Sequence, residues 1–278
     1  MGSRKKIGVF DSGYGGLTIL SDIQLLLPEY DYIYLGDNAR APYGTRSYEM
    51  VYQFTLQAVK KLFELDCELI ILACNTASAK ALRSIQQNDL NHIDSTKRVL
   101  GVIRPTAEQI GKYTSSGVVG VLGTPGTISS ESYIIEIKKH YPKLTVVQKA
   151  CPLWVPLIEN NLHNSKGGEI IIGEDFEELL QMTEEMDAVL LACTHYPIVL
   201  DQLTKIAKQG VQIITQGDIV ARSLKAYLFR HPKMESQLSK KGRTKFFTTD
   251  NPTTFNQNVS LFFGQAVQAE YIQIDTIE

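Results

Sequence analysis

The sequence predicts an α/β protein made of two doubly wound parallel-sheet domains, and three observations lead to this prediction. Short runs rich in Val, Ile and Leu alternate with longer stretches of helical periodicity, which is the pattern of parallel strands buried on both faces. The length of 278 residues suits two domains. Two of the apolar runs, each with the turn that follows it, also recur in the same order in the second half of the chain.

Each predicted strand leads into a turn or a helix. The run at 7–10 ends in a glycine-rich turn, and an amphipathic helix is expected at 17–27. Further strands are expected at 31–35, 68–73, 99–103, 118–122, 145–147, 188–191 and 211–214, and further helices at 48–65 and 77–86. Because ligands bind at the carboxyl ends of the strands in such sheets, the residues that follow each run are the candidates for function.

The internal repeat joins the two halves of the chain. CELIILACNTAS at 67–78 aligns with MDAVLLACTHYP at 186–197, and GVFDS at 8–12 aligns with GVLGT at 120–124. Two matches in the same order predict duplicated halves related by a pseudo-two-fold axis. A chance similarity between buried strands is the alternative.

Composition and charge exclude several classes of protein. Lys and Arg number 28 against 30 Asp and Glu, a formal charge of −2, which argues against nucleic acid or an anionic membrane as the main partner. The longest apolar runs are far shorter than a membrane span, and residues 1–6 lead into no signal-peptide apolar region. The four cysteines are typical of free thiols. We therefore expect a cytoplasmic protein whose main partner is neither nucleic acid nor a membrane.

Cys74 and Cys193 are the candidate catalytic residues. Each follows a buried strand and is expected to precede a helix, whose N–H groups and dipole favour a thiolate. If the two halves face each other, the sulfurs meet across one cleft. Two bases on opposite sides of a carbon atom are what proton exchange with inversion requires, and the resting pair would share one proton.

The alternative roles of these cysteines are a structural thiol, a zinc ligand and a disulfide partner. A buried structural thiol is the commoner fate of a free cysteine, and it is the expected one for Cys67, while Cys151 is expected to pack against the cleft wall. A zinc site is disfavoured because the chain has neither a CxxC pair nor a histidine cluster. A disulfide couple needs Cα atoms within about 6 Å, which a substrate between the thiols would prevent.

Polar residues at the strand-to-helix turns are the candidate substrate ligands. Asp11 can accept a hydrogen bond from an α-ammonium group, with a helix N-cap as the alternative. The hydroxyl, amide and backbone N–H groups of four more residues suit carboxylates, although such residues also cap helices; they are Ser12, Asn75, Thr76 and Thr194. His195 is expected near Cys193. The remaining histidines are expected on the surface: His92, His140, His163 and His231.

Four motifs together resemble the glutamate racemase family, within the cofactor-independent aspartate/glutamate racemase superfamily. They are FDSGYGGLT at 10–18, GDNARAPYG at 36–44, ACNTAS at 73–78 and CTHYP at 193–197. The resemblance covers nearly the whole chain, and it implies two α/β domains with the active site in the cleft between them. It implies that Cys74 serves the D-enantiomer and Cys193 the L-enantiomer, without pyridoxal phosphate, another cofactor or a metal. It also implies that backbone N–H groups of Tyr43 and Gly44 hold the substrate, and that Asp11 assists proton transfer near Cys74.

The resemblance also bears on the domains and the biological role. The first domain is expected to comprise residues 1–98 and 214–278, and the second 99–213. Glu159 resembles a family carboxylate near the second cysteine, with a solvated helix face as the alternative. The expected function is interconversion of L- and D-glutamate, which supplies D-glutamate for peptidoglycan, in a homodimer of unspecified geometry. The alternatives are racemisation of aspartate or another amino acid, and a non-catalytic binding protein derived from this scaffold.

The chain departs from the family pattern at a few places. Ala192 stands where glycine is usual before the second cysteine, and Tyr14 replaces a small aliphatic residue. Residues 215–218 lack the Asp-Ser pair often found there, and the stretch 160–173 is longer than is typical. These departures concern local loop shape and regulation rather than the chemistry.

Overall fold

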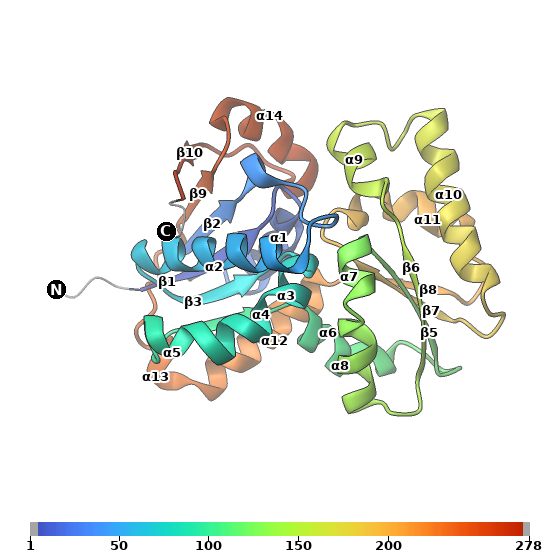
Figure 1. Cartoon of the computed structure of the whole chain (residues 1–278), viewed down its shortest axis with the longest axis horizontal. Helices are drawn as coiled ribbons and strands as arrows, with labels where there is room; N and C mark the ends of the chain where they lie inside the picture. Colours follow the sequence, from blue (N-terminus) through green and yellow to red (C-terminus); the bar gives the residue numbers. More distant parts are fainter. Residues whose placement is uncertain (1–4, 275–278) are drawn as a thin grey trace.

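The computed structural model contains two parallel β-sheets, each covered by helices on both faces, arranged side by side (Figure 1). It describes residues 5–274. Residues 1–4 and 275–278, which the expected first domain includes, lie outside the described part. The prediction of two parallel-sheet α/β domains is confirmed.

The first sheet has six strands in the order β10-β9-β2-β1-β3-β4, all paired in parallel. The strands are β1 (Lys6–Asp11), β2 (Tyr32–Gly36), β3 (Cys67–Leu72), β4 (Arg98–Gly101), β9 (Thr244–Thr248) and β10 (Ala269–Tyr271). Almost every residue of the three central strands is buried, which explains their continuous apolar sequences.

The second sheet has four parallel strands in the order β6-β5-β7-β8. They are β5 (Val118–Gly123), β6 (Thr145–Ala150), β7 (Ala188–Ala192) and β8 (Gln212–Ile214). This order repeats the order β2-β1-β3-β4 of the first sheet, so that β1 corresponds to β5 and β3 to β7. The repeat seen in the sequence therefore joins strands with equivalent places in the two sheets.

Helices cover both faces of each sheet. In the first, α1 (Gly16–Leu26) packs against α12 (Gly217–Arg230) and α14 (Pro252–Phe263) on one face, while α2 (Tyr48–Glu64) and α3 (Asn75–Lys80) cover the other. In the second, α6 (Ile103–Gln109) and α8 (Ser132–His140) pack together, and α10 (Lys166–Gln181) packs against α11 (Leu200–Ile206). The face of the first sheet covered by α1 and the face of the second sheet covered by α10 belong to one apolar core that extends across both domains.

The remaining elements are short. They are α4 (Leu82–Ser84), α5 (Leu90–Ile93), α7 (Pro125–Ser129), α9 (Trp154–Glu159), α13 (Pro232–Glu235), a π-helical turn (Ile85–Asp89), and 3-10 turns at Asn38–Arg40, Ile110–Lys112 and Tyr196–Val199.

Several details differ from the sequence-based expectations. The strand expected at 99–103 ends at Gly101, and β4 pairs with β3, so an expected domain boundary after residue 98 falls inside the first sheet. Cys67 is the first residue of β3 rather than a residue before it. His163, expected on the surface, is buried, and its carbonyl accepts a hydrogen bond from Nε2 of Gln202 on α11 at 3.0 Å.

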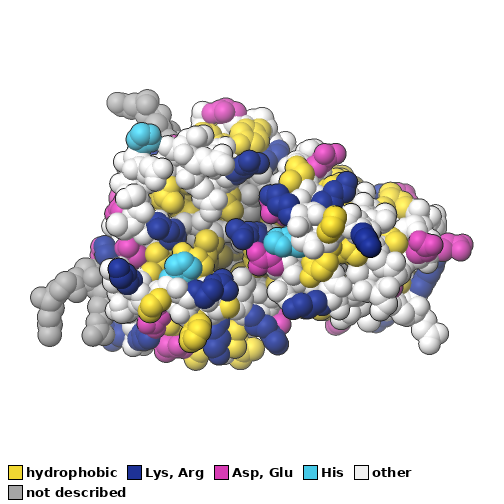
Figure 2. Space-filling model, turned by 90° about the horizontal axis from the view of Figure 1, so that it is seen from below, with side chains coloured by type: hydrophobic (Ala, Val, Ile, Leu, Met, Phe, Trp, Pro, Cys, Tyr) yellow, Lys and Arg dark blue, Asp and Glu magenta, His cyan; other side chains and the backbone are white. Residues whose placement is uncertain are grey.

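The surface carries charges of both signs. Figure 2 shows Lys and Arg side chains interspersed with Asp and Glu over one face of the molecule. Within residues 5–274, no helix is both long enough and apolar enough to cross a membrane.

Candidate functional site

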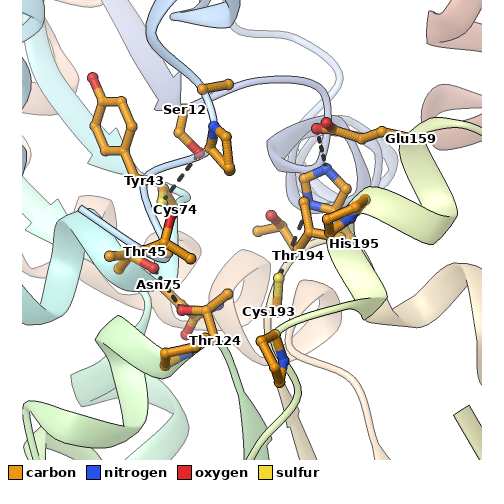
Figure 3. A pocket seen from close by; sticks show the side chains of 18 residues that line it. Ser12, Tyr43, Thr45, Cys74, Asn75, Thr124, Glu159, Cys193, Thr194 and His195 are labelled. Carbon is orange, nitrogen blue, oxygen red and sulfur yellow. Dashed lines mark hydrogen bonds and ion pairs between the residues drawn. The ribbon is translucent and has the colours of Figure 1, made fainter. Parts of the chain in front are cut away.

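A cavity opens between the two domains at the carboxyl ends of the central strands. The space open to the centres of water-sized molecules within it is about 60 Å³. Cys74 from the first domain and Cys193 from the second lie on opposite sides of it (Figure 3). The other lining residues are Ser12, Ala41, Pro42, Tyr43, Gly44, Thr45, Asn75, Thr76, Thr124, Pro125, Pro152, Val155, Pro156, Glu159, Thr194 and His195.

Cys74 stands at the N-terminus of α3, as expected from its place after a strand. It is the N-cap residue, and its Sγ accepts a hydrogen bond from the backbone N–H of Ala77 at 3.4 Å. The same sulfur lies 3.6 Å from Oγ of Ser12. Burial and the charge of Asp11 raise the pKa of the Cys74 thiol to about 12, against the opposing effect of the Ala77 and Ser12 contacts. Cys74 is therefore a protonated thiol at neutral pH.

Cys193 has different surroundings, and here the expectation of a helix directly after the cysteine is wrong. The chain enters the 3-10 turn Tyr196–Val199, and α11 begins only at Leu200. The sulfur lies 4.0 Å from Nδ1 of His195, whose Nε2 lies 2.9 Å from Oε1 of Glu159. The charge next to this sulfur therefore comes from a side chain rather than from a helix N-terminus.

His195 is buried between two acidic groups. Burial alone lowers its pKa, but the hydrogen bonds and charges of Cys193 and Glu159 outweigh burial and raise the pKa to about 10. The imidazole is therefore positively charged at neutral pH. The sequence analysis offers two interpretations of Glu159, as a site carboxylate or as part of a solvated helix face. In the structure, Glu159 lies on the cavity wall.

Asp11 lies behind the cavity wall. The structure buries it completely, and burial raises the pKa of its carboxyl group. Oδ2 accepts from the backbone N–H of Gly13 at 2.9 Å, and Oδ1 accepts from the hydroxyl of Thr194 at 3.4 Å. Asp11 thus contacts the cavity lining through the hydroxyl of Thr194 and is not itself part of the lining.

Tyr43 and Gly44 line the cavity on the first domain. The Tyr43 hydroxyl donates to Oδ2 of Asp37, which also accepts from Arg40 Nε at 2.7 Å. The carbonyl of Gly44 accepts from the backbone N–H of Gly126 in the second domain at 2.7 Å. The loop is therefore held on both sides of the cleft.

Asn75 and Thr76 contact the second domain. The Thr76 hydroxyl lies 2.9 Å from the hydroxyl of Thr124, a residue equivalent to Ser12 in the internal repeat. The side-chain amide of Asn75 hydrogen-bonds Gln216 and Tyr133. The alignment of 8–12 with 120–124 was a signal for Thr124; Gln216 carried no such signal, because its partners lie far away in the sequence.

Gly15 is required by a close approach between the domains. A Cβ atom at this position would lie 2.3 Å from Oγ1 of Thr194 and 2.4 Å from Nδ1 of His195. The glycine-rich turn expected after β1 therefore packs directly on the turn that carries Cys193.

The other cysteines lie away from the cavity lining. Cys67 and Cys151 are buried, and burial raises the pKa of both thiols, to about 12 for Cys67. Trp154 is fully buried, with its Nε1 donating to Asp175 at 2.8 Å. In the part of the chain that the structure describes, no group of three or more His, Cys, Asp or Glu side chains is placed to hold a metal ion.

The chain is similar to known proteins over most of its length. Residues 19–224 match the family model described as Asp/Glu/Hydantoin racemase. The glutamate racemase of Geobacter metallireducens is 37% identical over 94% of this chain and 93% of its own length. That of Persephonella marina is 36% identical over 98% of both chains.

Solved structures show the same fold over the full length. A glutamate racemase isoform from Bacillus anthracis matches with a TM-score of 0.88 and 31% identity, covering 98% of this chain and 99% of its own. The glutamate racemase of Francisella tularensis, solved in complex with D-glutamate, matches with a TM-score of 0.85 and 33% identity, covering 99% of each chain. The family model places this chain among the Asp/Glu/Hydantoin racemases, and its nearly full-length relatives show that it belongs to the glutamate racemase family.

Proposed function

We propose that this protein interconverts L- and D-glutamate, with Cys74 and Cys193 as the two bases. The observation that carries the proposal is that the two thiols follow equivalent strands of the two sheets and line one cavity from opposite sides. A planar carbanion between them can lose a proton to one sulfur and gain one from the other.

The proton inventory of the reaction balances. With L-glutamate, the Cys193 thiolate takes the proton from Cα, the C–H electron pair stays on the carbon as a carbanion delocalised into the α-carboxylate, and the Cys74 thiol donates its proton to the opposite face. The high pKa of Cys74 keeps it protonated for this step, and the positive charge of His195 lies beside the thiolate. D-glutamate uses the complementary protonation state, in which Cys74 is the thiolate and Cys193 the thiol.

The substrate's charged groups require partners around this axis. We assign the carboxylates to Ser12, Thr76, Thr194 and His195 and to backbone N–H groups of Tyr43, Gly44 and Asn75. The buried charge of Asp11 favours the α-ammonium group from behind the wall. An alanine side chain would leave the partners of the second carboxylate unpaired, at about 1–3 kcal/mol for each group, and aspartate is one methylene shorter. We therefore expect kcat/KM for glutamate to exceed that for aspartate, and comparable values would contradict the glutamate assignment.

Solvent isotope incorporation tests the two-base arrangement. In D₂O, each turnover of L-glutamate should place a solvent deuteron at Cα of the product, while substrate recovered early should carry little deuterium. A single shared base would exchange solvent into both pools and would contradict the proposal. Activity should survive dialysis, chelators and carbonyl reagents, since thiols supply both proton transfers.

The biological setting follows from the same proposal. The D-glutamate formed would supply peptidoglycan synthesis in the cytoplasm, and the protein would act as a homodimer. Sedimentation equilibrium of the purified protein tests the assembly, and a monomer at micromolar concentration would contradict it.

A further inference from the structure

Gln216 lies where the chain crosses from the second domain to the first. It follows β8 of the four-stranded sheet and immediately precedes α12, which packs against α1. Its side chain is 3% exposed.

Gln216 completes a closed ring of buried hydrogen bonds. Its Oε1 accepts from Nδ2 of Asn75 at 2.7 Å, and its Nε2 donates to the hydroxyl of Tyr133 at 2.7 Å. The Tyr133 hydroxyl in turn donates to Oδ1 of Asn75 at 2.5 Å. Every member both donates and accepts, an arrangement in which the bonds strengthen one another.

The ring extends across the domain boundary. Asn75 is the first residue of α3 and directly follows Cys74, whereas Tyr133 lies on α8 of the second domain. Nε2 of Gln216 donates its second hydrogen to Oγ1 of Thr106 on α6 at 2.9 Å. Helix α6 begins just after β4, where the chain first passes from the first domain to the second. Removing one partner leaves a buried polar group unpaired, which makes the arrangement costly to distort.

We propose that Gln216 is a positioning residue that holds the Asn75–Cys74 turn against the second domain and so sets where the Cys74 sulfur stands relative to the substrate. The proposal rests on the proposed function for its catalytic consequence. Both ends of the Asn75 amide are engaged in the ring, so Asn75 contributes to the substrate site through its backbone.

We call the hydrogen-bonded ring of Gln216, Asn75 and Tyr133 the clamp. Replacing Gln216 with methionine tests its role. Gln216→Met keeps the length of the side chain but removes the partner of Asn75 Nδ2. Because a misplacement of about 1 Å can cost about 10²-fold, we expect kcat to fall by roughly 10- to 10²-fold. Proton transfer at Cys74 should become more rate-limiting. The primary isotope effect with [2-²H]-D-glutamate, which gives its deuteron to Cys74, should therefore rise, and that with [2-²H]-L-glutamate should fall.

Two further variants make this result specific. Tyr133→Phe removes another member of the ring and should move both isotope effects in the same directions. Thr55→Val, the matched control, removes a buried hydroxyl that donates to Val51 within α2, and it should leave both isotope effects unchanged. Unchanged isotope effects in Gln216→Met and Tyr133→Phe, both shown to be folded, would overturn the proposal.

A second measurement is independent of turnover. Iodoacetamide labelling followed by mass spectrometry gives the alkylation rate of each cysteine, and Gln216→Met should raise the rate at Cys74 relative to that at Cys193. An unchanged ratio, or an equal rise at both cysteines, would overturn the clamp. This labelling tests the clamp even if the parent protein racemises no glutamate, an outcome that would contradict only the proposed function.

Discussion

Glu159 contacts the imidazole of His195 on the side away from Cys193. Its Oε1 lies 2.9 Å from Nε2 of His195, while Nδ1 of the same ring lies 4.0 Å from the Cys193 sulfur. The ring is therefore a charged bridge between a carboxylate on α9 and the candidate base on the turn after β7.

Replacing Glu159 with glutamine should lower the pKa of His195 from about 10. A histidine whose pKa rises on folding stabilises the protein fully below its unfolded pKa of about 6.5, and this contribution is lost as pH rises through the folded value. The free energy of unfolding, measured in urea from pH 6 to 10.5, should therefore decline less steeply with pH in Glu159→Gln than in the parent. Glu136→Gln, on an exposed ion pair with Lys139, is the control and should keep the parent slope. Equal slopes in Glu159→Gln and the parent would contradict the bridge.

The two cysteines should both be essential. Cys74→Ser and Cys193→Ser should each reduce racemisation by at least about 10²- to 10⁴-fold, because a serine hydroxyl is too weakly acidic to replace the thiol. Coupled assays with each enantiomer measure the rate. Cys67→Ser, at a buried position away from the cavity, is the control and should lose stability while it keeps a near-parent rate. A folded Cys74→Ser or Cys193→Ser variant with near-parent activity would rule out the two-base mechanism.

The charge of Asp11 should be measurable at Cys74. Because Asp11 helps to raise the pKa of that thiol to about 12, Asp11→Asn should lower it. The pH dependence of Cys74 alkylation in a Cys193→Ser background reports this change, and its midpoint should move to lower pH. Asp22→Asn, on α1 and half-buried beside Asp218, should leave the midpoint in place. An unmoved midpoint in Asp11→Asn would show that this carboxylate does not act on Cys74.

Gly15 should tolerate no side chain. The Cβ atom of Gly15→Ala would overlap Thr194 and His195, and overpacking of this kind costs about 1–3 kcal/mol. Activity should fall as well, because the displaced turn carries Cys193. Gly167→Ala on α10 meets nothing within 4 Å and should be neutral or stabilising by about 0.5–1 kcal/mol. Thermal unfolding and racemisation rates compare the two, and a Gly15→Ala protein with parent values for both would contradict the close approach.

The sequence predicts the central strands and the Cys74 turn because the information is local. Buried strands such as β3 are continuous apolar runs, and a residue between such a strand and a helix is a natural N-cap. The edge strand β10 has only three residues, none of them buried, so its sequence carries little signal. Only the family resemblance, and no local pattern, assigns the segment 244–248 to the first domain; in the structure this segment pairs with β2 in the first sheet.

The environment of each site residue depends on contacts between distant segments. Glu159 meets His195 across 36 positions, and Gln216 meets Asn75 across 141. Periodicity cannot report such pairs, because it describes which face of an element is buried and not what lies opposite. The same limit explains the buried His163. After Cys193 the chain enters a 3-10 turn that begins at Tyr196, with Pro197 as its second residue, instead of the expected helix.

The unequal surroundings of the two sulfurs have a consequence for measured rates. One sulfur caps a helix and the other lies beside an imidazolium, so the two half-reactions face different barriers. Mirror-image substrates nevertheless have the same free energy in water, and their interconversion has an equilibrium constant of one. For a racemase, kcat/KM must then be identical in both directions. The asymmetry can appear only as a compensating difference, with the enantiomer that turns over faster also having the higher KM.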